Sequence, residues 1–111
     1  MWIFTEFGFF SIVAHRSKPG VLLVRGRVRA DLEAFAKRVG VGTDGDGVFE
    51  DPQADYRYRL EVCDVAVSRV LSEAVQTMRY DNFKAQVEQT QGLEREQVYM
   101  GVWSHLRRFL R

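Results

Sequence analysis

The chain has 111 residues, of which 16 are basic and 15 acidic, so its formal net charge is +1. A chain of this length can bury one core, and we predict a single domain over residues 1–111. The near balance of charges argues against a protein that binds nucleic acid nonspecifically over its whole surface, and the 13% of aromatic residues excludes a disordered chain.

The N-terminal part of the chain predicts a β-hairpin. Residues 8–16 are rich in aromatic and β-branched residues, which favour a strand, and the Ser-Lys-Pro-Gly stretch at 17–20 is typical of a turn. Residues 21–29 then form the second arm. Residues 2–5 extend the first strand or form a short strand of their own.

A helix, a loop and a further strand follow. Apolar residues recur at helical spacing from Asp31, and Gly40 is a typical C-terminal stop. Residues 41–55 are typical of a loop, with 48–49 as a candidate edge strand. Residues 56–62 alternate strictly between aromatic or apolar and charged side chains, which predicts a strand.

The remaining sequence predicts helices. Asp64 is the expected cap of the first, a second runs over residues 81–91, and a third covers residues 93–109. The fold class we predict is α+β: an antiparallel sheet of three to four strands packed against helices, in the order β-β-α-(β)-β-α-α.

Two glycine-rich patterns lie in the predicted loop. Residues 40–45 spell GxGxxG, but a helix precedes them, whereas a dinucleotide fingerprint needs a strand before it and a helix after it. Residues 44–47 match the start of a calcium loop, and the match fails at Val48 and Phe49. We predict a flexible turn without a cofactor, and a weak cation site stays open.

Cys63, His15 and His105 are the candidate nucleophile and bases. Nothing in the sequence brings a histidine next to Cys63, so we expect no catalytic residue, no metal and no cofactor, and interpret Cys63 as a small buried residue. Because Cys63 is the single cysteine, it excludes an intrachain disulfide and a zinc site built from cysteines. A small enzyme that uses Cys63 and His15 is the lowest alternative.

The apolar content does not predict a membrane protein. No apolar run approaches the roughly 18 residues of a membrane span. Glu6 and Gly8 interrupt the apolar start of the chain, which also lacks the basic segment of a signal peptide. We therefore expect a cytoplasmic protein with no membrane partner.

Arginines stand at every second position of two predicted strands. Side chains alternate between the two faces of a strand, so Arg25, Arg27 and Arg29 share one face. Arg57 and Arg59 repeat the pattern in the next strand. If the two strands are neighbours, five guanidinium groups lie on one surface, where facing like charges cost roughly some tenths of a kcal/mol per pair.

Three explanations of this charge stay open. The arginines are solvated or paired with acids of the same chain, such as Glu61 or the carboxylates of residues 44–55; they bind an acidic protein; or they bind a phosphate backbone. Among functions we favour a small non-catalytic binding protein that engages an acidic protein partner. Such a protein would be a phage- or plasmid-related inhibitor or an adaptor. A nucleic-acid-binding module using the same face is the alternative.

Tyr80, Asn82 and Lys84 are the candidate rim of this binding site. Helix capping alone explains the acid and the amide of this stretch, because the side chain of Asp81 or Asn82 accepts backbone N–H bonds at the start of the helix. The functional interpretation makes the three residues a recognition edge beside the arginines. We also predict homodimerisation through the C-terminal helix, whose apolar stripe includes Tyr99 and Trp103.

Several stretches of the chain together resemble an uncharacterised family of short bacterial proteins. They are GFFS at 8–11, RGRVR at 25–29, DYRYR at 55–59, YDNFK at 80–84 and the late Tyr99, Val102 and Trp103. The resemblance implies a self-contained domain of this length, and it brings no catalytic residue or cofactor with it.

Overall fold

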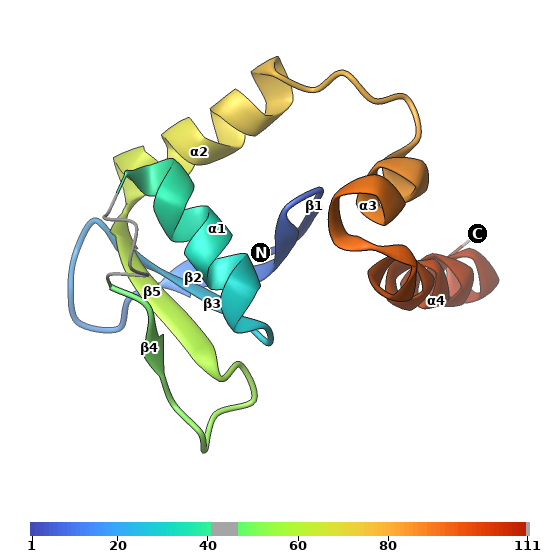
Figure 1. Ribbon diagram of the computed structural model, residues 1–111. Helices are drawn as coiled ribbons and strands as arrows, with labels where there is room; N and C mark the ends of the chain where they lie inside the picture. The colour runs from blue at the N-terminus through green and yellow to red at the C-terminus, as the bar shows by residue number, and fades with distance from the viewer. Residues whose placement is uncertain (41–46, 111) are drawn as a thin grey trace. The chain divides into compact units, whose positions relative to one another are not determined.

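The computed structural model describes residues 1–40 and 47–110, which divide into two compact units. The first unit, Met1–Met78, contains a β-sheet and two helices. The second unit, Arg79–Arg111, contains a pair of helices (Figure 1). A single domain over the whole chain stays a prediction.

One sheet of five antiparallel strands lies within the described residues. The strands are β1 Trp2–Thr5, β2 Gly8–Ala14, β3 Val21–Gly26, β4 Phe49–Glu50 and β5 Tyr58–Cys63, in the spatial order β1-β2-β3-β5-β4. This confirms the predicted α+β fold. The sheet has more strands than expected because β1 pairs with β2 as a strand of its own and the short β4 pairs with β5.

The second arm of the hairpin is shorter than the alternation of its side chains predicts. β3 ends at Gly26, Arg27 lies in a bend, and Arg29 is the first residue of helix α1, Arg29–Val39. The prediction that Arg27 and Arg29 belong to the strand is therefore wrong. The chain leaves the sheet here because α1 must turn back over it to bury Leu32. The prediction that Arg57 belongs to the next strand is wrong as well, because β5 begins at Tyr58 and not at residue 56.

Helix ends in the first unit are set by local backbone preferences. Gly40 ends α1 in the left-handed conformation with φ of 94°, as predicted, because glycine adopts positive φ without a steric penalty. Helix α2, Asp64–Gln76, has Cys63 at its N-cap position, and Cys63 provides no side-chain cap. The expectation that Asp64 is the cap is wrong, because Asp64 is already the first helical residue.

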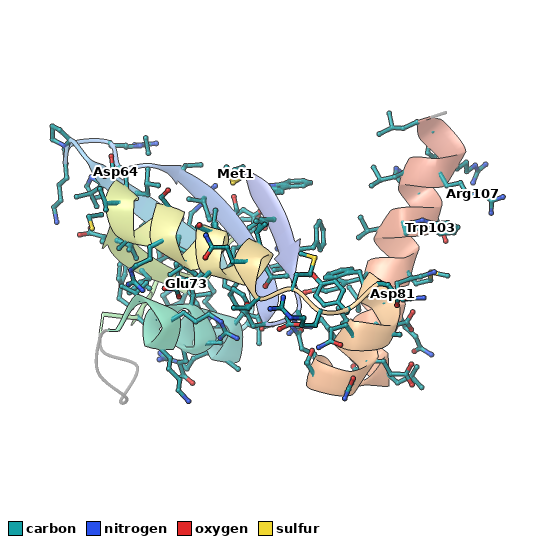
Figure 2. All side chains as sticks on the ribbon, turned by 90° about the horizontal axis from the view of Figure 1, so that it is seen from above. Met1, Asp64, Glu73, Asp81, Trp103 and Arg107 are labelled. Atoms are coloured by element: carbon teal, nitrogen blue, oxygen red, sulfur yellow. The ribbon has the colours of Figure 1, made fainter. Side chains whose placement is uncertain are left out.

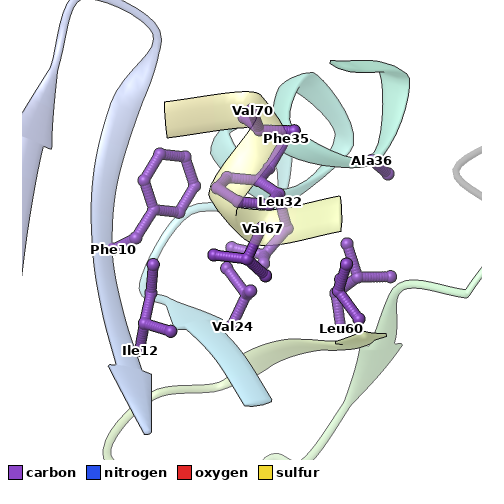
Figure 3. Packing of buried hydrophobic residues seen from close by; sticks show 10 residues of the cluster. Phe10, Ile12, Val24, Leu32, Phe35, Ala36, Leu60, Val67 and Val70 are labelled. Atoms are coloured by element: carbon purple, nitrogen blue, oxygen red, sulfur yellow. The ribbon is translucent and has the colours of Figure 1, made fainter. Parts of the chain in front are cut away.

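The hydrophobic core lies between the sheet and the two helices α1 and α2 (Figure 3). Its buried members come from β2, β3, β5 and both helices: Phe10, Ile12, Val24, Leu32, Phe35, Ala36, Leu60, Val62, Val67 and Val70. The ring of Phe10 meets the ring of Phe35 edge-on with centroids 5.1 Å apart. Burying each large apolar side chain contributes about 1.5–3 kcal/mol, so this face of the sheet holds the unit together.

The second unit pairs helix α3, Phe83–Gln91, with helix α4, Leu93–Phe109. Asn82 caps α3 by accepting a hydrogen bond from the backbone N–H of Ala85 at 3.0 Å, as predicted. Gly92 separates the two helices with φ of 96°. No helix in residues 1–40 and 47–110 is both long and apolar enough to cross a membrane.

Candidate binding face of the sheet

Within the first unit, α1 and α2 both pack on one face of the sheet, and no element of residues 1–40 and 47–78 covers the other (Figure 1). We call this other side the open face. Residues that pair across antiparallel strands point to the same face, so the strand register defines a line of side chains. This cross-sheet row spans all five strands and consists of Trp2, Ser11, Arg25, Arg59 and Phe49.

The centre of the cross-sheet row is a pair of arginines directly opposite each other. Arg25 on β3 pairs with Arg59 on β5, and neither has a carboxylate within ion-pair distance among the described residues. Arg25 donates from Nη2 to Ser11 Oγ at 2.7 Å, and Arg59 donates from Nε to the carbonyl of Tyr56 at 3.1 Å. Uncharged groups therefore orient both guanidinium groups without neutralising them.

The other three predicted arginines have carboxylate partners. Arg27 donates from both terminal nitrogens to Asp55, at 2.9 and 3.2 Å, and this hydrogen bonding raises the pKa of Arg27. Arg57 donates to Glu50, which likewise raises the pKa of Arg57, and Arg29 lies 3.7 Å from the same carboxylate. Asp55 in the loop before β5 thus neutralises Arg27, and Glu50 on β4 pairs with Arg57 and Arg29, as the explanation by internal pairing predicts.

Two tyrosines hold the arginines in place through their ring faces. Tyr56 is 8% exposed, and the guanidinium carbons of Arg25 and Arg27 lie 4.8 and 4.7 Å from its ring centroid. Tyr58 has Arg29 at 5.3 Å from its ring centroid. Cations over aromatic faces are attracted by about 0.5–2 kcal/mol, which offsets part of the repulsion between neighbouring arginines.

Aromatic side chains stand at both ends of the cross-sheet row. Trp2 is 70% exposed and meets Phe9 edge-on, with ring centroids 6.1 Å apart. Phe9 in turn stacks on Phe4 at 4.5 Å, and Phe49 at the other end of the row is 44% exposed. Exposed aromatic residues beside arginine are the composition of interface anchors, which bury a large rigid surface on binding.

A separate charged cluster occupies the open face beside the hairpin turn. Glu61 accepts a hydrogen bond from Lys18 Nζ at 2.8 Å and lies 3.0 Å from Nε2 of His15. These contacts, with Lys18 the larger, lower the pKa of Glu61. Glu61 stands directly opposite Leu23, so the one acid within the predicted arginine stripe is engaged away from Arg25 and Arg59.

Two of the candidate catalytic residues, Cys63 and His15, lie in the first unit, and His105 lies in α4 of the second unit. Cys63 is exposed, which contradicts the interpretation of a buried residue, because the chain passes there from β5 into α2 at the edge of the core. Within residues 1–40 and 47–78 no hydrogen bond joins Cys63 to His15, and Nε2 of His15 lies 3.0 Å from Glu61. In residues 1–40 and 47–110, no group of three His, Cys, Asp or Glu side chains is arranged to hold a metal ion.

The predicted rim residues all belong to the second unit. Asn82 is the cap of α3, and Lys84 Nζ lies 3.5 Å from Met100 Sδ and 4.9 Å from the ring centroid of Trp103. The ring of Tyr80 lies 6.0 Å from that of Phe83. These contacts lie within the unit, and a rim beside the arginines stays a prediction.

The apolar stripe of α4 is partly exposed. Trp103 is 45% exposed and has Arg107 on its ring at 5.4 Å (Figure 2), while Leu106 is 47% exposed. Homodimerisation through this helix stays a prediction. The GxGxxG and calcium-loop patterns fall mainly on residues 41–46, which lie outside the described residues.

Sequence reasoning missed three members of the cross-sheet row: Trp2, Ser11 and Phe49. Alternation within a strand shows only which residues of that strand share a face. Only the register between strands shows that these residues stand in line with Arg25 and Arg59.

No family model matches the chain, and no curated protein or solved structure has significant similarity to it. The resemblance to a family of short bacterial proteins stays a prediction. What the protein does is therefore inferred from the geometry and charge of the open face.

Proposed function

We propose that the protein is a non-catalytic binding protein that engages an acidic protein partner through the open face of its sheet. The observation that carries the proposal is the pair Arg25 and Arg59, which oppose each other without a carboxylate among the described residues. Like charges facing each other across a sheet are unfavourable. A partner carboxylate relieves this repulsion and accepts charge-assisted hydrogen bonds, which are about twice as strong as neutral ones.

Acidic side chains next to the arginine pair favour a protein over a nucleic acid. Glu61 lies two residues beyond Arg59 on β5, and Asp55 lies shortly before the first residue of that strand. A phosphate backbone carries a charge at every nucleotide, but these carboxylates already neutralise Arg27 and Lys18, so a nucleic acid strand gains little attraction there beyond the arginine pair. A protein segment places a negative charge only where the arginines lie, and its apolar residues can cover Trp2 and Phe49.

The proposal can be tested by selecting, from a displayed library of random peptides, those that bind the immobilised full chain. We expect the selected peptides to be enriched in Asp and Glu. A variant carrying Arg25→Gln and Arg59→Gln should bind them about tenfold more weakly or worse, since hydrogen bonds between charged groups contribute about 1.5–3 kcal/mol. Arg27→Gln is the matched control, because Arg27 is already paired with Asp55, and it should leave affinity unchanged.

Two results would overturn the proposal. One is a set of selected peptides without acidic residues, or one that the double variant binds as well as the wild type does. The other is binding of a labelled oligothymidylate or oligouridylate that weakens steeply with salt and depends on Arg25 and Arg59. That second result would assign the face to single-stranded nucleic acid.

A further inference from the structure

The cross-sheet row has a regular spacing that limits what can lie along it. Neighbouring strands are about 4.8 Å apart, so Trp2 on β1 and Phe49 on β4 are separated by four intervals, or about 19 Å. The midpoint between Arg25 and Arg59 lies about 12 Å from the Trp2 end and about 7 Å from the Phe49 end. The row is therefore asymmetric, with its charge nearer to Phe49.

The arginine pair fits one carboxylate. Arg25 and Arg59 are on adjacent strands, so one carboxylate placed between them offers one oxygen to each guanidinium group. Their neighbours in the row are Ser11 and Phe49, and neither carries a charge that attracts a second acid. Ser11 is 1% exposed, and its Oγ accepts a hydrogen bond from Arg25. The Arg25 side chain is therefore already ordered and loses little conformational entropy when an anion binds.

The spacing of the row matches an extended chain. In an extended segment, side chains on one face repeat about every 6.8 Å, and seven residues span about 20 Å. A helix of seven residues spans only about 10 Å. In an extended segment the acid then lies two residues from the apolar side chain over Phe49 and four residues from the one over Trp2.

We infer that the open face binds an extended segment of about seven residues laid across the strands, with one carboxylate on Arg25 and Arg59 and an apolar side chain at each end on Trp2 and Phe49. This inference rests on the proposed function and names the form of the acidic partner. The bound segment makes no strand-to-strand ladder, so its specificity comes from these three side chains.

Isothermal titration of the full chain with a capped peptide, Leu-Thr-Ser-Thr-Glu-Thr-Leu, tests the inference. The peptide places the acid and both leucines at the required spacing, and threonine favours the extended form. Replacing Glu by Gln should weaken binding about tenfold, and replacing either Leu by Ser should weaken it about fivefold. Moving Glu by one position, to the centre of the peptide, turns the carboxylate to the opposite side of the extended chain. This peptide should lose the gain in affinity that the Glu peptide has over the Gln peptide.

Protein variants separate this inference from the function on which it rests. Trp2→Ala and Phe49→Ala should each weaken the peptide about fivefold, whereas Trp103→Ala, at an exposed tryptophan of the second unit, should not. If only the arginine double variant loses binding, the acidic partner stands and the cross-strand mode is wrong. The same holds if library-selected acidic peptides bind and the heptapeptide does not. If the double variant still binds every acidic peptide, both proposals are wrong.

Discussion

The two faces of the sheet in the first unit use the same alternation of side chains for opposite purposes. On the covered face Phe10 and Val24 are fully buried against helices. On the open face the alternate positions of the strands place Arg25 opposite Arg59 and leave Trp2 exposed. One set of alternate positions thus stabilises the fold, while the other can be adapted to a partner with little cost in stability.

The open face itself contains two kinds of arginine. Arg27 and Arg57 lie beyond the strand ends, where Asp55 and Glu50 supply carboxylates. Arg25 and Arg59 lie within the paired strands, where the described residues supply none. A basic stripe in a sequence is therefore evidence for a binding site only after its counter-charges have been located. Here that step reduces five candidate arginines to two.

The largest effect is expected on the covered face, at Gly26. A Cβ at this position would collide with Leu32 Cδ2, and Leu32 is fully buried, so it has no room to move aside. Gly26→Ala should lower the free energy of unfolding by about 1–3 kcal/mol in urea denaturation followed by circular dichroism. Gly101 in α4 has open space around it, so Gly101→Ala is the control and should stabilise the protein by about 0.5–1 kcal/mol. An unchanged midpoint for Gly26→Ala would mean that the covered face is loosely packed here.

A smaller effect on stability is expected on the open face, at Arg59. Arg59→Glu places a carboxylate opposite Arg25, whereas Arg59→Gln only removes the charge; both lose the hydrogen bond to Tyr56. The Glu variant should therefore be more stable than the Gln variant by about 0.2–1 kcal/mol, and both should bind acidic peptides poorly. Equal stability of the two variants would show that the two side chains do not interact across the strands.

The smallest effect is expected at Glu61, and it depends on pH. Because Lys18 and His15 lower the pKa of Glu61 in the folded protein, the ionised carboxylate adds stability at neutral pH, and this stability is lost as the pH falls through the lowered pKa. In thermal melts the wild type should exceed Glu61→Gln slightly at neutral pH, and the two should converge in acid. Lys18→Gln should shrink the difference at neutral pH. A difference that stays constant with pH would show that the ion pairs of Glu61 do not contribute.

Much of the fold is predictable because it depends on short-range rules. Glycine at positive φ ends α1 at Gly40 and separates α3 from α4 at Gly92, and an Asn side chain caps α3 at Asn82. These features need only the conformational preferences of one residue and its neighbours. The prediction that the strand continues to Arg29 was wrong, because the end of β3 is set by where α1 packs. That contact is not encoded in the local preferences of the residues around Arg29.

The candidate site divides in the same way. By itself the sequence determined that arginines alternate with apolar residues and therefore face away from a core. It could not determine which arginines have partners, because Asp55 and Glu50 reach Arg27 and Arg57 only after the loop has folded. The cross-sheet row is visible only in the tertiary structure, since it depends on the register between strands that are distant in sequence, such as the pairing of Arg25 with Arg59, 34 positions apart.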